Sequence, residues 1–318
     1  MGEKTEISEF YDRADRHMLA GQYEEAIALY RKLAEIYPEK DSIVMSLAWA
    51  YRESGRMSDA VLCLEKLFEK ELKRKIFTGF AFDELVKIYR GEGNYERLVV
   101  ICEAAVTAQP DDISLITTLG NSYLEAGKAH RAVEIFERLT GMEPDNPALF
   151  CGLGKAHVAA GDFNKAEGAY DRAISMEPAD AHRFYNELGD VLFHAGHYDR
   201  AEKTLKRSLG HRHDQPLVHC AIGDVFIKQG KPNDAKMSYE TATNLDPAST
   251  AGYYNRLGNA CAAEHYGTMA IEAFEKAVST DPQNPFYYLN LVKLYEAEGL
   301  HDKARGIYKR GQARGVFS

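Results

Sequence analysis

Apolar side chains recur at spacings of three and four residues along most of this chain, and such spacings place them on one face of an α-helix. Within the segment 119–146, the apolar and small residues are Leu119, Gly120, Tyr123, Ala132, Phe136 and Leu139. Gly127 separates two such runs and Pro144 follows the second. Glycine reaches the left-handed dihedrals of a helix end and proline cannot continue a helix. The pattern therefore predicts two amphipathic helices joined by a tight turn.

The same unit recurs along the whole chain. The turn glycines follow one another at intervals of 34, 38, 34, 34, 35 and 34, and then one of 69: Gly21, Gly55, Gly93, Gly127, Gly161, Gly196, Gly230 and Gly299. The long interval equals two periods, and we place His265 where its glycine would stand. An alanine follows each turn by five residues, and only Leu98 breaks this column. A fixed period near 34 indicates stacked supersecondary units.

This pattern resembles the tetratricopeptide repeat family, and the residues of 119–146 quoted above carry the resemblance. We count nine repeats: 7–40, 41–74, 79–112, 113–146, 147–180, 182–215, 216–249, 251–284 and 285–318. The resemblance implies an all-α fold, an α-solenoid of tandem helix-turn-helix repeats that forms a right-handed superhelix. The first helix of each hairpin would line a concave groove. We predict one solenoid domain over 1–318, because each repeat buries its apolar face only against its neighbours.

Three insertions interrupt the period. Residues 75–78 are extra, and single extra residues fall at Ala181 and Thr250. Insertions in repeat proteins map to loops, so we expect all three in the connections between repeats. The third repeat has Val86 and Leu98 where the others have small residues. We therefore expect its hairpin to be more open.

Charge and cysteine usage restrict the class of protein. The net charge of −9 opposes nucleic-acid binding, which usually shows a basic footprint. The first ten residues, MGEKTEISEF, have no apolar core, and no run of 18 apolar residues occurs, so we expect neither a secretory signal nor membrane insertion. The five cysteines are scattered without a C-x-x-C pair. Scattered thiols suit a reducing compartment, and we expect a cytoplasmic protein.

The sequence contains no motif typical of an enzyme. A phosphate-binding loop, a dinucleotide fingerprint, a zinc-protease helix and a nucleophile elbow are all missing, so we expect neither catalysis nor a cofactor. Six of the eleven histidines fall within 182–219. Of these, His211, His213 and His219 lie near Asp214 in the sequence and are the candidate metal ligands. We prefer the interpretation that they are solvated histidines of a loop. We predict no metal site.

The groove side of the first helices carries the predicted binding residues. The first helix of most repeats has a small residue, such as Gly120 in the fourth repeat, and a polar or charged residue directly after it. In the second repeat, the residue after Ala48 is Trp49, the only tryptophan. Tryptophan is enriched at binding hot spots, so we predict that Trp49 anchors a partner; the alternative is that it folds against the neighbouring hairpin. Asparagine can hold the backbone of an extended peptide. The predicted groove residues are Met45, Trp49, Arg52, Lys87, Asn121, Lys155, Asn186, Asn255, Asn259, Asn290 and Lys293; ordinary repeat surface is the alternative for the asparagines.

These features together predict a non-enzymatic scaffold or adaptor that binds a peptide segment or a partner protein in its groove. An assembly factor for a multi-subunit or envelope complex is a variant of this function. A helical-repeat RNA-binding protein is the alternative from another class, and the acidic charge opposes it. The C-terminal repeat ends in Val316 and Phe317 beside Ile307 and Tyr308. We weigh two interpretations of this end: self-association or partner contact, and a tail that folds back over the last hairpin. The sequence does not name the partner, because fold does not fix function.

Overall fold

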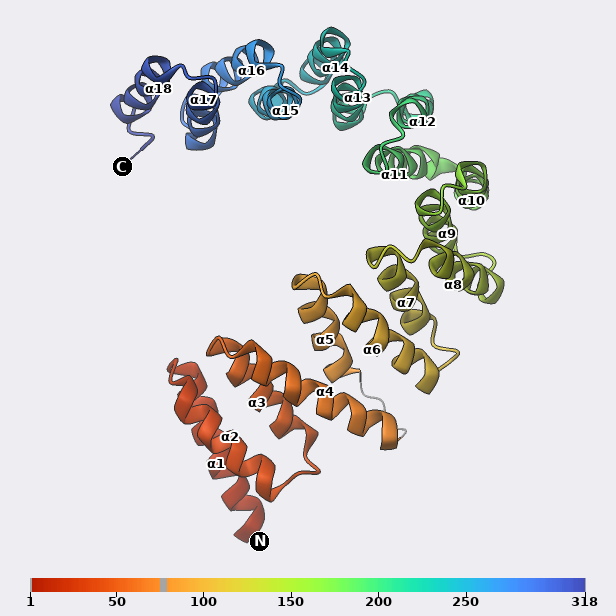
Figure 1. The fold of residues 1–318 in the computed structure, drawn as a ribbon, viewed down its shortest axis with the longest axis vertical. Helices are drawn as coiled ribbons and strands as arrows, with labels where there is room; N and C mark the ends of the chain where they lie inside the picture. Colours follow the sequence, from red (N-terminus) through yellow and green to blue (C-terminus); the bar gives the residue numbers. More distant parts are fainter. Residues whose placement is uncertain (1, 75–78, 318) are drawn as a thin grey trace. The chain divides into compact units, whose positions relative to one another are not determined.

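Eighteen α-helices fill the part of the chain that the computed structural model describes, residues 2–74 and 79–317, with side chains from Ser8 onward (Figure 1). In chain order they are α1 (Gly2–Leu19), α2 (Tyr23–Ile36), α3 (Asp41–Glu53), α4 (Met57–Arg74), α5 (Phe80–Gly91), α6 (Tyr95–Ala108), α7 (Ile113–Glu125), α8 (Ala129–Met142), α9 (Pro147–Ala159), α10 (Phe163–Met176), α11 (Ala181–His194), α12 (Tyr198–His211), α13 (Pro216–Lys228), α14 (Pro232–Leu245), α15 (Thr250–Ala263), α16 (Gly267–Thr280), α17 (Pro285–Ala297) and α18 (His301–Ala313). Each predicted repeat is one helical hairpin, which confirms the all-α repeat architecture.

The chain contacts group these hairpins into two compact units, Met1–Met142 and Glu143–Ser318. The first unit contains α1 to α8 and the second contains α9 to α18. In each unit, consecutive hairpins pack through the second helix of one and the first helix of the next. The single domain expected from the sequence stays a prediction.

The turn inside each hairpin is a left-handed residue. The eight turn glycines have positive φ values between 67° and 83°. His265 stands at the corresponding turn with a φ of 62°, and it is the one non-glycine residue with positive φ in the described chain. The prediction that His265 replaces the turn glycine is therefore confirmed. Histidine is among the residue types that tolerate this region better than most.

The connections between hairpins correct one expectation from the sequence. Ala181 and Thr250 do not lie in loops but are the first residues of α11 and α15. Each follows a single 3₁₀ turn, Pro178–Asp180 or Pro247–Ser249. The 3₁₀ turn continues directly into the helix, so the extra residue lengthens the helix instead of the loop. The insertion at 75–78 lies outside the described residues.

Five of the nine hairpins in the described chain are closed by a large side chain of the second helix that packs on a glycine of the first. The Tyr170 ring lies so close to Gly154 that a Cβ built on this glycine would meet the ring at 2.5 Å. The spacing between the small and the large position is the same in every hairpin of this kind: Gly120–Phe136, Gly154–Tyr170, Gly189–Leu205, Gly223–Tyr239 and Gly258–Phe274. Glycine is needed here because any side chain would occupy the space of the large side chain that faces it.

In the third hairpin, the larger residue of the pair is on the first helix and the smaller one is on the second. Val86 occupies the small position of α5, and Cys102, at the same spacing along the chain, occupies the large position of α6. Both side chains are buried, so the pair conserves volume across the two helices. Helices α5 and α6 are nevertheless the most loosely packed pair of the nine hairpins in the described chain. This agrees with the more open hairpin expected from Val86 and Leu98.

Tyrosines on the first helices also link neighbouring hairpins. The Tyr123 hydroxyl donates a hydrogen bond of 2.6 Å to Glu103 of α6, and the Tyr295 hydroxyl donates one of 2.7 Å to Glu275 of α16. Burial, together with the adjacent carboxylate, raises the pKa of both phenols to about 12. Both hydroxyls therefore remain protonated donors at neutral pH.

The C-terminal tail folds back over the last hairpin. The backbone N–H of Val316 donates to the carbonyl of Gly311 at 3.0 Å, with Gly315 in the left-handed region. Phe317 packs on Gly311 and stacks on Tyr308, with ring centroids 5.0 Å apart. Tyr308 remains 41% exposed. The structure thus shows the fold-back that was one of the two interpretations, and self-association stays a prediction.

The packing of Tyr170 on Gly154 predicts opposite effects for two glycines of the fifth hairpin. Gly154→Ala should lower the free energy of unfolding by about 1–2 kcal/mol, because overpacking of a filled core outweighs the better helix propensity of alanine. Gly168→Ala is the matched control, since nothing lies within 4 Å of its Cβ position on α10. It should stabilise the protein by up to about 1 kcal/mol. Urea unfolding followed by circular dichroism measures both; equal effects of the two substitutions would contradict the packing argument.

Candidate interaction surface on the first helices

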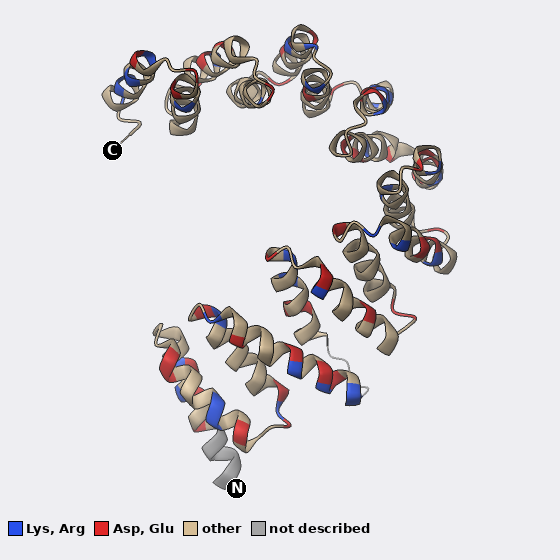
Figure 2. Ribbon diagram, in the orientation of Figure 1, with Lys and Arg blue, Asp and Glu red and all other residues tan. Residues whose placement is uncertain are grey.

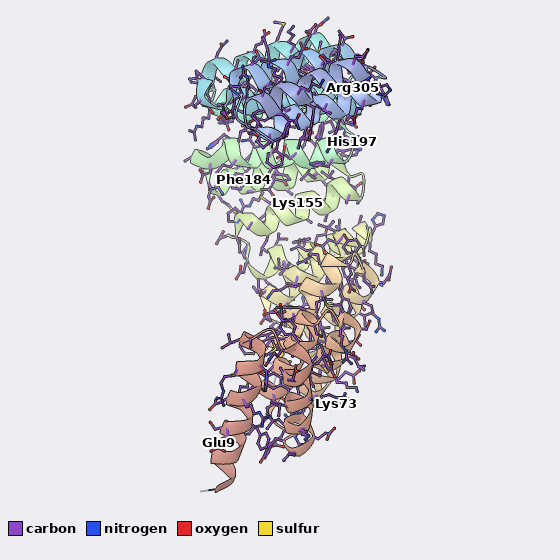
Figure 3. The ribbon with its side chains drawn as sticks, turned by 90° about the vertical axis from the view of Figure 1, so that its left-hand side faces the viewer. Glu9, Lys73, Lys155, Phe184, His197 and Arg305 are labelled. Atoms are coloured by element: carbon purple, nitrogen blue, oxygen red, sulfur yellow. The ribbon has the colours of Figure 1, made fainter. Side chains whose placement is uncertain are left out.

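The exposed side of the first helices is the surface on which the sequence places the binding residues, and we call it the inner face. In the second unit α9, α11, α13, α15 and α17 lie in one row, with α10, α12, α14 and α16 in the other (Figure 1). The position after the small residue is exposed in most hairpins of both units. Trp49, Lys87 and Asn121 are exposed there in the first unit, and Asn259 and Lys293 in the second. In Figure 3, Lys155 is labelled on α9 of the second unit.

Trp49 is the largest exposed side chain of the inner face in the first unit. It is 46% exposed on α3, and Met45, one turn earlier, is partly buried. Leu47 and Tyr51 of the same helix are buried in the hairpin core. This amphipathic division leaves Trp49 outside the core of its own hairpin. Its role in binding stays a prediction.

Several predicted groove residues are joined to the next hairpin by ion pairs. Glu84 on α5 accepts from Arg52 at 3.0 Å and from Lys87 at 2.7 Å, and its own side chain is only 15% exposed. In the second unit, Lys155 pairs with Glu187 at 2.6 Å. The shared carboxylate places Arg52 and Lys87 beside one another on the inner face.

The Asp224 carboxylate connects the inner face with the hairpin core. Arg256 of the next hairpin contacts one carboxylate oxygen at 2.6 Å, and the Tyr239 hydroxyl donates to the other at 2.5 Å. Tyr239 is fully buried, and burial followed by the nearby Asp224 charge raises its pKa far above the usual range. The large residue that closes the seventh hairpin therefore also fixes a charged group on the surface.

The predicted asparagines form pairs in only part of the inner face. The Asn290 amide donates to the Asn255 carbonyl oxygen at 2.9 Å, and the Asn186 amide donates to Gln215 at 3.0 Å. Asn121 and Asn259 stand apart, each exposed on its own helix and without a hydrogen-bond partner among the described residues. The asparagines therefore do not form one continuous row of peptide-binding groups.

Acidic groups that the sequence analysis did not select also lie on the inner face. Burial raises the pKa of Asp190, and the neighbouring Glu187 and Asp224 charges act in the same direction, against His194 and Arg256. The sequence did contain a signal for the ion pairs between repeats. The two partners of each pair are separated by the same number of residues, slightly fewer than the repeat period: Arg52–Glu84, Lys155–Glu187 and Asp224–Arg256. A search for opposite charges at nearly one repeat spacing would have found them.

The histidines of 182–219 are not gathered into a metal site. His211 stacks on Tyr185 with ring centroids 5.4 Å apart, and His213 is exposed. Burial lowers the pKa of His219, against the effect of a hydrogen bond with the His213 backbone. Among the described residues, no group of three or more histidine, cysteine or acidic side chains is placed to hold a metal ion. None of the described helices is long and apolar enough to cross a membrane.

Sequence comparisons relate this chain to other repeat proteins. A segment of 102 residues is 28% identical to the tetratricopeptide repeat domain-containing protein PYG7 of Arabidopsis thaliana, a chloroplast protein, and covers 31% of this chain and 34% of that protein. A segment of 91 residues is 28% identical to protein ycf37 of Cyanophora paradoxa and covers 28% of this chain and 53% of that protein. The chain therefore spans about a third to a half of the length of these curated relatives.

The fold has solved counterparts. A tetratricopeptide repeat protein from Parabacteroides merdae superposes with a TM-score of 0.51 at 17% identity, over 80% of this chain and 98% of that one. Sequence models described as tetratricopeptide repeat match residues 17–75, 117–157, 151–215, 217–249 and 251–284, which together make up more than half of the chain. With nine helical hairpins in the described residues and left-handed turns at the repeat period, the chain belongs to the tetratricopeptide repeat family.

Proposed function

We propose that this chain is a non-enzymatic scaffold that binds a segment of a partner protein on its inner face. The observation that carries this proposal is Trp49, 46% exposed beside the Arg52–Glu84–Lys87 ion pairs. A rigid aromatic ring supplies a large contact area at a low cost in side-chain entropy. Arg52 and Lys87 beside it add polar groups that a partner segment can contact.

The charge distribution favours a protein partner over a nucleic acid. Lysine and arginine are interspersed with aspartate and glutamate along the helices of each unit (Figure 2). On the inner face, the cations Lys155 and Arg256 are paired with carboxylates at 2.6 Å. Neutralised cations contribute little to phosphate binding, which depends on the release of counterions by free positive charge. An assembly factor for a larger complex would use the same surface in the same way.

The cysteines support a cytoplasmic location within this proposal. All five are free thiols, and four of them are buried. Burial raises the pKa of Cys102, Cys151 and Cys220 to about 12, so these thiols stay protonated and unreactive at neutral pH. Free buried thiols suit a reducing compartment.

Removal of the Trp49 ring should weaken partner binding without unfolding the protein. Trp49→Ala is expected to lower the affinity by about 2 kcal/mol, or roughly 30-fold, if the ring is a hot spot. The matched control is Tyr95→Ala, because Tyr95 is an aromatic of α6 in the same unit and 36% exposed; it should bind normally. Titration of the partner recovered from native cells by affinity purification measures both. Normal binding by Trp49→Ala would remove the anchor from the proposal.

Partner recovery should not depend on nucleic acid. Affinity purification with and without nuclease, followed by mass spectrometry, should return the same proteins, because the inner face has mixed charge. Purified protein should also fail to retain RNA at physiological salt. Tight RNA binding that weakens steeply as salt rises would favour the RNA-binding alternative.

A further inference from the structure

A cleft of about 540 Å³ opens over α16 in the second unit. Its floor is apolar and deeply buried: Leu257, Val278 and Leu291 are each no more than 2% exposed. The second helices α14, α16 and α18 supply most of its wall, including Met269 and Ile307. The cleft therefore belongs to the row of second helices, whereas the inner face belongs to the first helices.

Three cations and two carboxylates line the rim of this cleft. Arg310 is exposed and has no carboxylate within ion-pair distance in the described chain. Lys276 donates to the Tyr254 hydroxyl at 2.9 Å and lies 4.6 Å over the centre of that ring. The hydrogen bond to Tyr254 raises the pKa of Lys276, so its ammonium group stays charged. Lys236 is the third cation of the rim.

Two carboxylates, Glu272 and Glu275, also line the rim, and only Glu272 has a cationic partner in the part of the chain that the structure describes. Glu272 lies 3.6 Å from Lys236, and Glu275 accepts the hydrogen bond from Tyr295. Arg310 and Lys276 make no ion pair among the described residues, although the Glu240 and Glu272 charges act on Lys276. Helix α18 extends this positive region, since it carries four lysine and arginine residues against the single Asp302. The positive potential is local, because the whole chain has a net charge of −9.

We propose that this cleft binds an acidic amphipathic helix of a partner protein, at a site separate from the inner face. Apolar side chains one turn apart on such a helix would pack on Met269 and Ile307, the partly buried apolar residues of the cleft, as in other helix-in-groove complexes. Its acidic residues would meet Arg310 and Lys276 at the rim. Charge complementarity of this kind sets the orientation of a partner and speeds association.

A pair of synthetic helices tests the proposal. One fluorescein-labelled peptide carries leucines on one face with flanking glutamates, and the other has lysine in place of every glutamate. Fluorescence anisotropy with the full chain at physiological salt should show binding of the glutamate peptide at least about tenfold tighter than binding of the lysine peptide. Arg310→Glu should weaken the glutamate peptide by about tenfold and strengthen the lysine peptide, a reversal that general loss of structure would not produce.

Arg305→Glu is the matched control on the same helix. Arg305 has a side chain that is 75% exposed, pairs with Asp302 and does not line the cleft, so this variant should change the affinity by less than about twofold. Trp49→Ala should bind both peptides as the unsubstituted chain does, which separates this site from the inner face. An equal loss with Arg305→Glu would overturn the proposal, because it would show non-specific attraction to α18. Binding of phosphatidylserine vesicles without binding of the glutamate peptide would overturn it as well.

Discussion

The close approach of a large side chain on the second helix to a glycine on the first is the contact that closes five of the nine hairpins in the described part of this protein. A Cβ at Gly223 would lie 2.7 Å from the Tyr239 ring, and one at Gly258 would lie 2.6 Å from the Phe274 ring. Neither ring is more than 2% exposed, so it has no free space into which to move. Because the interior is packed near its maximum density, the size of one residue fixes the size that its partner can have.

The same contact organises the surface. Tyr239 closes the seventh hairpin and at the same time donates to Asp224, which holds Arg256 of the next repeat. Tyr30 of the first hairpin donates to Asp15 in the equivalent way. Bonds of this kind restrain charged groups on the inner face through residues of the core. The surface proposed to bind a partner is thus set in part by side chains that no partner could touch.

The sequence predicted what depends on local backbone chemistry: the helices, the turn glycines, the histidine that replaces one of them, and the exposure of Trp49. It did not predict that Ala181 and Thr250 are the first residues of helices, because a 3₁₀ turn and a loop have similar residue preferences. The complementary pair Val86 and Cys102 and the ion pair Lys155–Glu187 were missed as well. They join residues on different helices, so a pattern read along one helix does not contain them. The cleft over α16 is lined by residues of five helices, so only the structure could identify it.

An exchange of sizes in the fourth hairpin tests the central claim most directly. Gly120→Val and Phe136→Cys together reproduce the Val86–Cys102 pair of the third hairpin. Singly, Gly120→Val should cost about 1–3 kcal/mol by overpacking, and Phe136→Cys about 3 kcal/mol by the cavity that it leaves. A double-mutant cycle measured by urea unfolding should show that the double variant recovers at least about 1 kcal/mol of the summed loss. Strictly additive losses would contradict the claim that the two side chains fill one shared space.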